Sequence, residues 1–293
     1  MNKSIKTALV VEGGAMRGIF ASGVLDAFLE NQHNPFHFTV GVSAGSTNLI
    51  GYLSGNHGRS KQILFQHARS NDFINFRRYL RGGHFCDVNW LWEMSFKQVP
   101  LNFDRYLEQE TPLFVVTTNV NTGKACYFEV TADNMHQLFP ASCAIPFMYR
   151  DFPRVDDEPM TDGGLADAIP VIWAYEQGAR DITVILSQPL GFKKPQIRFP
   201  ALIKPFFKNN PSLFNTALNR ATRYNQALDF IRTPPSDCRV QVISPPNNFE
   251  VKRLTLNTKL LDVGYEQGRN AGLQHINQKT DLSIFKKAHS LAS

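Results

Sequence analysis

Long apolar runs are missing from this chain of 293 residues. A membrane-spanning helix needs roughly 20 consecutive apolar residues, and no segment approaches that length. Near the start, only residues 8–11 form an apolar run after residues 1–6, whereas the apolar part of a secretory signal has roughly 7–15 residues. We therefore expect neither a spanning helix nor a secretory signal peptide, and we expect any membrane contact to be peripheral.

Cysteine is scarce as well, with four in the whole chain. Cys86, Cys126, Cys143 and Cys238 lie far apart, and no two of them form a C-x-x-C pair. This spacing gives no sign of a disulfide framework or of a zinc site. We expect reduced cysteines in the core of a cytoplasmic protein.

Acidic residues are absent from residues 182–228, although the chain as a whole has 25. The same stretch is basic and aromatic. Its charged residues are Lys193, Lys194, Arg198, Lys204, Lys208, Arg220 and Arg223, and its phenylalanines are Phe192, Phe199, Phe206, Phe207 and Phe214. Prolines at 189, 195, 200, 205 and 211 are expected to break regular structure.

Two interpretations of this stretch stay open. In one, residues 189–215 lie on an anionic membrane and act as a lid or an entrance to a site, because basic and aromatic side chains bind such surfaces. In the other, they form a basic surface loop whose phenylalanines pack into the core. The net charge of +6 permits attraction to a membrane or to nucleic acid, without identifying either.

Short apolar runs alternate along the chain with segments of helical periodicity. Strands that alternate with helices favour an α/β fold with a mainly parallel central sheet and helices on both faces. We expect one domain over residues 1–293, closed by a helical region at about 250–293. The sequence predicts strands over residues 7–11, 36–40, 113–120, 125–130, 181–186 and 239–243, and helices over residues 19–31, 44–53, 134–143, 171–177 and 255–276.

A glycine-flanked serine, in Gly41-Val42-Ser43-Ala44-Gly45, follows the second predicted strand and precedes a predicted helix. The G-x-S-x-G pattern is typical of a sharp strand-to-helix turn that presents the serine oxygen as a nucleophile. A tight turn with a purely structural purpose is the alternative. As a nucleophile, Ser43 requires a base that takes its proton.

A second glycine-rich turn, Gly13-Gly14-Ala15-Met16-Arg17-Gly18, follows the first predicted strand. The N–H groups of Gly14 and Ala15 are candidates for binding an oxyanion, where one such donor is worth roughly 2.7–4 kcal/mol in the transition state. Arg17 is a candidate for holding a substrate phosphate or an acidic neighbour. Dinucleotide binding is disfavoured, because Ala15 replaces the middle glycine of G-x-G-x-x-G and no acidic residue ends the next strand.

The base for Ser43 is either a histidine or a carboxylate. None of the eight histidines follows a predicted strand in a turn, and we expect His275 and His289 to face solvent. The carboxylate of Asp162 is favoured instead, because Gly163 and Gly164 after it permit close approach to other backbone. A dyad of this kind requires burial to raise the pKa of the carboxyl toward the working pH.

These motifs, in this order, resemble those of the patatin-like phospholipase family, which carries G-G-G-x-[R/K]-G, G-x-S-x-G, A-S-x-A-x-P and D-G-[G/A]. The third motif is Ala141-Ser142-Cys143-Ala144-Ile145-Pro146. The resemblance covers residues 7 to about 186. It implies a three-layer α/β/α sandwich that needs neither a metal nor an organic cofactor.

The resemblance also assigns the site residues. It implies a catalytic dyad of Ser43 and Asp162 without histidine, with oxyanion N–H groups from Gly14 and Ala15 and assistance from Arg17. The remaining motif positions are Gly13, Gly18, Gly41, Gly45, Gly163 and Gly164. The chain departs from the family at Ala15, where the third glycine is expected. Its Cβ restricts positive φ and weakens the expected oxyanion geometry.

The function implied by the resemblance is a serine-dependent lipid acyl hydrolase of the phospholipase A or lysophospholipase kind, acting through an acyl-enzyme intermediate. Its expected partners are phospholipid, lysophospholipid or other acyl esters and an anionic membrane surface, and not nucleic acid. Two alternatives stay open: an acyltransferase of related fold, and a lipid-binding regulatory protein with little activity. Residues 192–223 and the C-terminal third match none of the four motifs, so head-group selection is not predicted.

Overall fold

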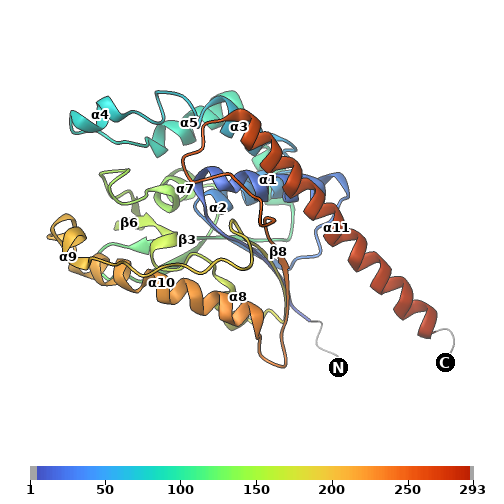
Figure 1. Cartoon of the computed structure of the whole chain (residues 1–293). Coiled ribbons are helices and arrows are strands. Elements are labelled where there is room, and N and C mark those ends of the chain that lie inside the picture. Colours follow the sequence, from blue (N-terminus) through green and yellow to red (C-terminus); the bar gives the residue numbers. More distant parts are fainter. Residues whose placement is uncertain (1–4, 291–293) are drawn as a thin grey trace.

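The sheet at the centre of the molecule is mixed and mainly parallel (Figure 1). The computed structural model describes residues 5–290, apart from the side chains of Phe206 and residues 279–290. Within them, eight strands pair in the order β5-β6-β3-β2-β1-β7-β8, with β4 also paired to β3. The parallel strands are β1 (Thr7–Val11), β2 (Phe38–Val42), β3 (Leu113–Asn119), β7 (Asp181–Ile185) and β8 (Arg239–Ile243), and the antiparallel ones are β4 (Ala125–Glu129), β5 (Arg154–Val155) and β6 (Glu158–Asp162).

Two strands follow one another along a single edge of β3. β2 pairs with residues 113–116 of β3 and β6 with residues 117–119. β4 pairs with residues 114–118, overlapping both, so it occupies the opposite edge. β2 and β6 run toward each other and their carboxyl ends meet, because Val42 pairs with Val116 and Asp162 pairs with the next residue, Thr117.

Alternate side chains of the sheet enter two separate cores. On β1, the buried side chains of Leu9 and Val11 belong to one core, and those of Ala8 and Val10 to the other. A parallel strand that is covered on both faces has to be apolar throughout, which explains the uninterrupted apolar run of residues 8–11. The core therefore lies in two layers, one above and one below the sheet.

Helices cover both faces of the sheet (Figure 1). On one face lie α1 (Gly18–Glu30), α2 (Ala44–Leu53), α3 (Arg59–Gln66), α5 (Val88–Gln98), α7 (Met135–Cys143) and α11 (Thr258–Ser290), and on the other lie α8 (Val171–Glu176) and α10 (Pro211–Arg232). α6 (Phe103–Glu108) packs beside α2. Short 3-10 turns are η1 (Ala15–Arg17), η2 (Gly163–Leu165) and η3 (Lys204–Phe207). The expected three-layer α/β/α sandwich is confirmed.

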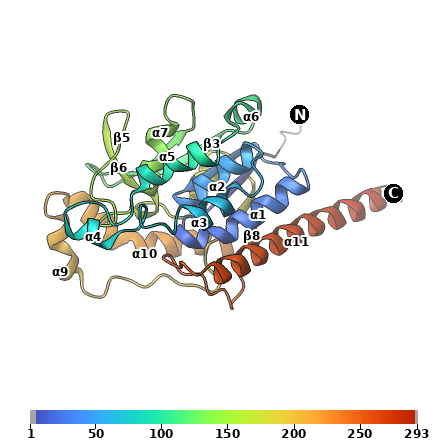
Figure 2. The same ribbon diagram turned by 90° about the horizontal axis from the view of Figure 1, so that it is seen from above.

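Two short helices, α4 (Phe76–Leu80) and α9 (Pro200–Ile203), lie at the same end of the molecule in both Figure 1 and Figure 2. The opposite end holds the last turns of α11. Among residues 5–290, no helix combines the length and the apolar character needed to cross a bilayer.

The C-terminal helix α11 runs along α1 with its backbone in direct contact (Figure 2). A Cβ on Gly23 of α1 would collide with the carbonyl of Tyr265, and one on Gly268 with the carbonyl of Phe20. The hydroxyl of Tyr265 donates to Asp26 Oδ2 at 2.8 Å. α11 thus anchors the helix that begins directly after the glycine-rich turn.

Most predicted elements are confirmed to within a few residues, and the exceptions have physical causes. The strand predicted over residues 36–40 is found at Phe38–Val42, because Gly41 pairs within the sheet and does not form a turn. The last helix begins at Thr258, where the side chain of Asn257 accepts a backbone N–H at 2.9 Å. Helices α3 to α6 were not predicted, since their short segments lack a clear period.

Three of the five prolines in the acid-free stretch begin helices, which corrects the prediction that they break regular structure. Pro189 and Pro195 lie in irregular chain, as predicted. Pro200, Pro205 and Pro211 occupy the first turns of α9, η3 and α10. A first turn tolerates proline because the missing N–H would have no partner inside the helix. As a result, a helix of 22 residues stands where irregular chain was expected.

His275 also differs from its prediction. It was expected to face solvent, but only 8% of it is exposed, and its ring lies 5.8 Å from that of Phe28. The cause is the tight contact of α11 with α1, which turns this face of the helix inward. The side chain of His289 lies outside the described residues.

Candidate active site

Ser43 stands at a strained turn between β2 and α2. Its φ of 52° lies in the left-handed region, and its side chain is buried, with 6% exposed. Non-glycine residues adopt this backbone only where the surroundings enforce it. Here Ser46 does so in part, because its hydroxyl donates to the Ser43 carbonyl at 2.7 Å. The strain therefore falls on the serine itself and not on Gly41 or Gly45.

The motif glycines serve instead to let segments approach closely. A Cβ on Gly45 would collide with the carbonyl of Val11, so this glycine brings α2 against the end of β1. A Cβ on Gly163 would collide with the carbonyl of Val116 on β3. Similar crowding at 2.7–2.9 Å surrounds Gly13, Gly14, Gly18 and Gly41, and at Gly164 the nearest atom is Asp162 Oδ1 at 2.9 Å.

Asp162 lies at the end of β6, beside the end of β2 that leads into Ser43. Its Oδ1 accepts the N–H of Gly164 at 2.8 Å, and only 6% of the residue is exposed. Burial raises the pKa of this carboxyl, while the Arg220 guanidinium and hydrogen bonds from the Ser43 hydroxyl and from Gly164 oppose the rise. The structure thus places the two residues at adjoining strand ends, in a site whose burial shifts the pKa of the carboxyl upward.

The segment Ala141 to Pro146 connects the two. Ser142 Oγ accepts the N–H of Ser43 at 2.9 Å and donates to the carbonyl of Val116 at 2.7 Å. Two residues on, the carbonyl of Ala144 accepts the N–H of Asp162 at 3.0 Å. This third motif therefore fixes the backbones of both Ser43 and Asp162 where β2 and β6 end.

The turn at Gly13 to Ala15 lies across from Ser43, and both Gly14 and Ala15 line the same cavity as the serine. Ala15 has a φ of 50°, so it adopts the left-handed backbone that a third glycine would adopt freely. Ala15 therefore adopts positive φ in spite of its Cβ, which was expected to restrict it. Within the described residues, no backbone carbonyl accepts the N–H of Gly14 or Ala15, which leaves both donors available.

Arg17 contacts two neighbouring side chains. Its guanidinium donates to Ser187 Oγ at 3.0 Å and lies 4.0 Å from the carboxylate of Glu12. Burial lowers its pKa, and the charge of Glu12 opposes that change. Two roles were considered for Arg17, and the structure shows the one in which it holds an acidic neighbour, Glu12. Arg17 is not among the described residues that line either cavity beside Ser43.

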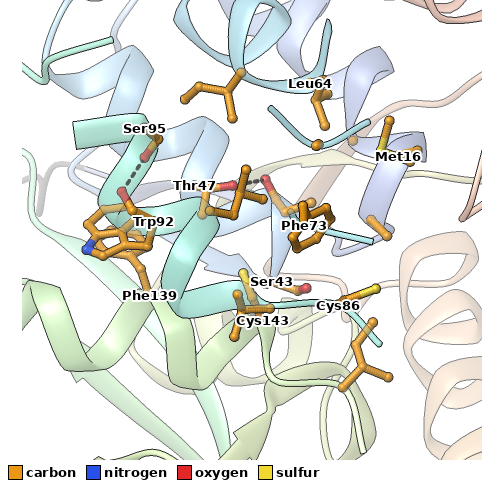
Figure 3. A pocket seen from close by; sticks show the side chains of 18 of the residues that line it. Met16, Ser43, Thr47, Leu64, Phe73, Cys86, Trp92, Ser95, Phe139 and Cys143 are labelled. Carbon is orange, nitrogen blue, oxygen red and sulfur yellow. Dashed lines mark hydrogen bonds between the residues drawn. The ribbon is translucent and has the colours of Figure 1, made fainter. Parts of the chain in front are cut away.

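An apolar cavity of about 140 Å³ extends from one side of Ser43 (Figure 3). Its wall comes from α2, α3, α5 and α7. The lining includes Met16, Thr47, Leu64, Phe73, Cys86, Trp92, Phe139 and Cys143. Burial raises the pKa of the Cys143 thiol to about 12, so this neighbour of Ser43 stays protonated and uncharged.

A second cavity, of about 270 Å³, extends from the other side of Ser43 and has a different character. Asp162 and the Gly13 to Ala15 turn line it, together with the basic side chains of Lys194, Arg220 and Arg253. Ala15, Ser43, Ile145 and Arg253 line both cavities. Ser43 therefore lies where an apolar and a basic cavity meet.

Most of the residues that line the second cavity could not be identified from the sequence. Lys194 and Arg220 were included only as part of a basic stretch, and Glu12, Tyr224 and Arg253 were not singled out. The absence of acidic residues from 182–228 was the available signal, because part of that stretch faces the site. Of the histidines whose side chains are described, none lines either cavity.

A family model described as patatin-like phospholipase matches residues 9–175, more than half of the chain. The chain belongs to the patatin-like phospholipase family. This patatin-like protein is accordingly a hydrolase of carboxylic esters, of the phospholipase or esterase kind. A second model, a domain of unknown function named DUF6363, matches residues 210–282, which include α10 and most of α11.

Known proteins similar to this patatin-like chain include one curated relative. The uncharacterized protein YjjU of Escherichia coli (strain K12) is 31% identical over 271 residues, covering 91% of this chain and 76% of that protein. Among solved structures, VipD from Legionella pneumophila has 12% identity and a TM-score of 0.49, covering 94% of this chain and 67% of that one. Human GIVD cytosolic phospholipase A2, in complex with methyl gamma-linolenyl fluorophosphonate, has 17% identity and a TM-score of 0.28, covering 43% and 23%.

Proposed function

We propose that this patatin-like protein is a lipid acyl hydrolase that uses Ser43 and Asp162 as a catalytic dyad on phospholipids or lysophospholipids. The observation that supports it most is the position of Ser43 on the shared wall of two cavities, one of which the buried carboxyl of Asp162 also lines. An ester with an apolar acyl part and a polar alcohol part matches this pair of cavities.

In the proposed reaction, the Ser43 hydroxyl gives its proton to the Asp162 carboxylate while Oγ bonds to the acyl carbon. The N–H groups of Gly14 and Ala15 stabilise the resulting oxyanion. Asp162 then gives the proton to the departing alkoxide, and the bond between it and the acyl carbon breaks. Water hydrolyses the acyl-Ser43 ester in the same way, with Asp162 again as base.

The acyl chain would occupy the apolar cavity. Each methylene removed from water contributes about 0.8 kcal/mol. Since about 1.4 kcal/mol corresponds to a factor of ten, each methylene should raise kcat/KM roughly fourfold until the cavity is full. A series of p-nitrophenyl esters from acetate to dodecanoate measures this dependence, and a flat profile would contradict the assignment of the cavity.

A fluorophosphonate probe tests the dyad directly. We expect mass spectrometry to find one adduct per chain on Ser43, and we expect Ser43→Ala to prevent it. Ser43→Ala and Asp162→Asn should each lower kcat/KM on p-nitrophenyl butyrate by roughly 10³-fold or more, with the far-UV circular dichroism unchanged. Turnover retained in either variant would contradict the dyad.

The same assay separates the alternatives. An acyltransferase would pass the acyl group to an added alcohol or thiol in preference to water, so products are compared with and without the acceptor. A lipid-binding regulatory protein would bind lipid without labelling at Ser43. The paired position of Ser43 and Asp162 favours hydrolysis over this second alternative.

Peripheral contact with an anionic membrane belongs to the same proposal. The end of the molecule that carries α4 and α9 exposes large apolar side chains: Phe76 (61%), Leu80 (70%), Phe199 (59%) and Leu202 (70%). Exposed basic residues accompany them, at Arg77, Arg81, Arg198, Lys204 and Lys208. Apolar and basic side chains side by side are typical of surfaces that bind anionic lipid.

This surface adjoins the site, because Ile197, Ile203 and Phe207 line the basic cavity. Residues 189–215 would therefore act as the entrance for lipid. Vesicle sedimentation tests the contact: binding should rise with the fraction of phosphatidylglycerol and fall with salt. Leu202→Ser should weaken it about tenfold, whereas Leu107→Ser on α6, which is also exposed (55%), should not.

A further inference from the structure

Three basic side chains meet in the second cavity without a carboxylate partner. Lys194, Arg220 and Arg253 all line it, and in the described part of the chain none of them forms an ion pair within 4.0 Å of an acidic group. They come from three separate segments: the chain after β7, helix α10, and the loop before α11. Cations gathered in one partly enclosed space repel each other and lose hydration, so the arrangement has a cost.

The two acidic residues of this cavity offset that cost only in part. Glu12 is engaged on its own side, where it accepts the N–H of Ser187 at 2.7 Å and the hydroxyl of Tyr224 at 2.9 Å. Asp162 accepts the N–H of Gly164 and belongs to the proposed dyad. The cavity therefore keeps an excess of positive charge directed at the space beside Ser43.

Contacts with other segments of the same polypeptide hold Lys194 and Arg220 in position. The backbone of Lys194 makes a pair of hydrogen bonds with the side chain of Asn225 on α10, at 2.9 and 3.0 Å, and its ammonium lies 4.3 Å from the centre of the Tyr224 ring. Arg220 uses Nε to donate to the Gly164 carbonyl at 2.6 Å. With Nε so engaged, its terminal nitrogens remain for another acceptor.

The backbone of Arg253 is held as well. Its carbonyl accepts the N–H of Met16 at 3.3 Å, directly after the proposed oxyanion turn. Because Arg253 lines both cavities, its side chain is close to the point where they meet at Ser43. An anion bound among the three cations would thus lie a short way from the ester that Ser43 attacks.

We propose that Lys194, Arg220 and Arg253 form the subsite for the phosphate of the substrate head group, and that it favours head groups with net negative charge. This inference rests on the proposed function and names the substrate class of the same site. A phosphate supplies acceptors for all three cations, and arginine nitrogens match its oxygens in pairs. An ammonium on the head group, as in choline lipids, would find no free carboxylate here, since Glu12 and Asp162 are engaged.

The protonation of Lys194 offers an independent signal. Burial, together with the charges of Arg220, Arg253 and Arg17, lowers the pKa of its ammonium to about 7, and Glu12 alone among these groups opposes the change. A bound phosphate would favour the protonated form and raise that pKa. At pH 8 the free site is mostly unprotonated at Lys194, so binding of a phosphate should take up close to one proton.

Calorimetry on the Ser43→Ala variant tests the subsite without any turnover. Monomeric dihexanoyl phosphatidylglycerol, dihexanoyl phosphatidylcholine and inorganic phosphate are titrated at pH 8 in two buffers of different ionisation enthalpy. We expect the phosphatidylglycerol to bind at least tenfold more tightly than the phosphatidylcholine and to take up a proton. Lys194→Gln in the same background should remove the uptake, and Lys193→Gln, at the exposed neighbouring lysine, should keep it.

Hydrolysis supplies the second test. In the active protein, the ratio of rates on dihexanoyl phosphatidylglycerol and on neutral dihexanoylglycerol should fall about tenfold or more in Lys194→Gln and in Arg253→Gln. The ratio should change less than twofold in Lys193→Gln and in Lys252→Gln, which alter exposed lysines adjacent in sequence. Arg220→Gln is a weaker choice, because it also removes the contact with Gly164.

The outcomes separate the two proposals. Binding and proton uptake by the phosphatidylglycerol support the subsite even if neither ester is hydrolysed, a result that would overturn the proposed function alone. Equal affinity for both phospholipids, or binding of inorganic phosphate only, would overturn the head-group assignment. A rate ratio that stays unchanged in both Lys194→Gln and Arg253→Gln would overturn it as well, with hydrolysis left standing.

Discussion

Ser142 holds the main chain of Ser43: its hydroxyl accepts the Ser43 N–H at 2.9 Å and donates a hydrogen bond to the carbonyl of Val116 at 2.7 Å. These two backbone groups lie at the junction where the carboxyl ends of β2 and β6 meet beside β3, so neither strand can satisfy them. Ser142 is completely buried, so water cannot replace it. One hydroxyl thus completes the sheet and fixes the strained turn that carries the proposed nucleophile.

Ser142→Ala should therefore lower both stability and activity. Loss of the hydroxyl leaves a buried N–H and a buried carbonyl without partners. Each unpaired group costs about 1–3 kcal/mol of stability. We expect the free energy of unfolding in urea to fall by about 2 kcal/mol or more, and kcat on p-nitrophenyl butyrate to fall about tenfold as Ser43 relaxes.

Ser54→Ala is the matched control. Ser54 is also buried, with 1% exposed, yet its hydroxyl has no hydrogen-bond partner among the described residues. Removing it should leave stability and activity nearly unchanged. Equal losses in the two variants would mean that the bridge from Ser142 to Ser43 has no special role.

Ala15 is expected to tolerate glycine but not valine. The left-handed backbone at φ 50° costs a side-chain-bearing residue about 1–2 kcal/mol, while glycine adds roughly 0.4–1 kcal/mol of entropy to the unfolded chain. Ala15→Gly should then raise the free energy of unfolding by about 0–1.6 kcal/mol and keep full activity, because the N–H stays in place.

Ala15→Val provides the contrast. A β-branched residue is strongly disfavoured at positive φ, so the turn should shift and the two proposed oxyanion donors with it. We expect kcat to fall by roughly 10²-fold or more with a small change in KM. A fully active Ala15→Val variant would contradict the role of this turn.

The pKa of Asp162 predicts linked effects of pH. Burial raises this pKa, and only the carboxylate can accept the Ser43 proton, so kcat/KM should fall as pH decreases through the raised value. The free energy of unfolding depends on pH in the opposite sense, because the raised pKa of Asp162 favours the folded state at low pH. The cost of the buried charge is absent below the pKa of an unfolded aspartate, about 3.9, and is complete above the raised value.

Asp162→Asn removes that charge. Its gain in melting temperature over the wild type should therefore grow as pH rises, starting near zero at about pH 4. Ser43→Ala, equally inactive but with the carboxyl retained, should lack this growing gain. Melting curves from pH 4 to 9 measure it, and parallel curves for wild type and Asp162→Asn would count against a raised pKa.

Arg17 should matter equally for all esters. Its guanidinium contacts Glu12 and Ser187 and lies outside both cavities, so it supports the oxyanion turn and not the head group. We expect Arg17→Ala to lower kcat/KM about tenfold or more on phosphatidylglycerol and on the neutral diacylglycerol alike. A selective loss on the phospholipid would assign the phosphate to Arg17 instead.

The parts of the site that are local in sequence could be predicted, because strand, turn and helix follow one another within a few residues. The segments Gly13 to Gly18 and Gly41 to Gly45 are local in this sense. Each contains a turn between a strand and a helix, as its glycine pattern predicts. The two glycines after Asp162 mark it as a candidate in the sequence. Its position at the end of strand β6 was not predicted. What sequence alone could not give was the register on β3 that brings Asp162 to Ser43.

The cations of the second cavity could not be predicted for the same reason. Lys194, Arg220 and Arg253 belong to three segments, and only the folded chain brings them together. Proline has two opposite effects on regular structure: Pro200 and Pro211 are expected to interrupt it, but each begins a helix. The composition identifies residues 182–228 as a basic region. It does not show which lysines of that region line the cavity.

Because the two cavities meet at one serine, the products of a cleaved ester would depart by separate routes and in a fixed sequence. The head-group alcohol is free once the acyl bond breaks, and its exit vacates the basic cavity for incoming water. The fatty acid stays on the apolar side until that water has reacted. Accumulated fatty acid would then slow the cycle at its last step, while the alcohol product would compete with the attacking water.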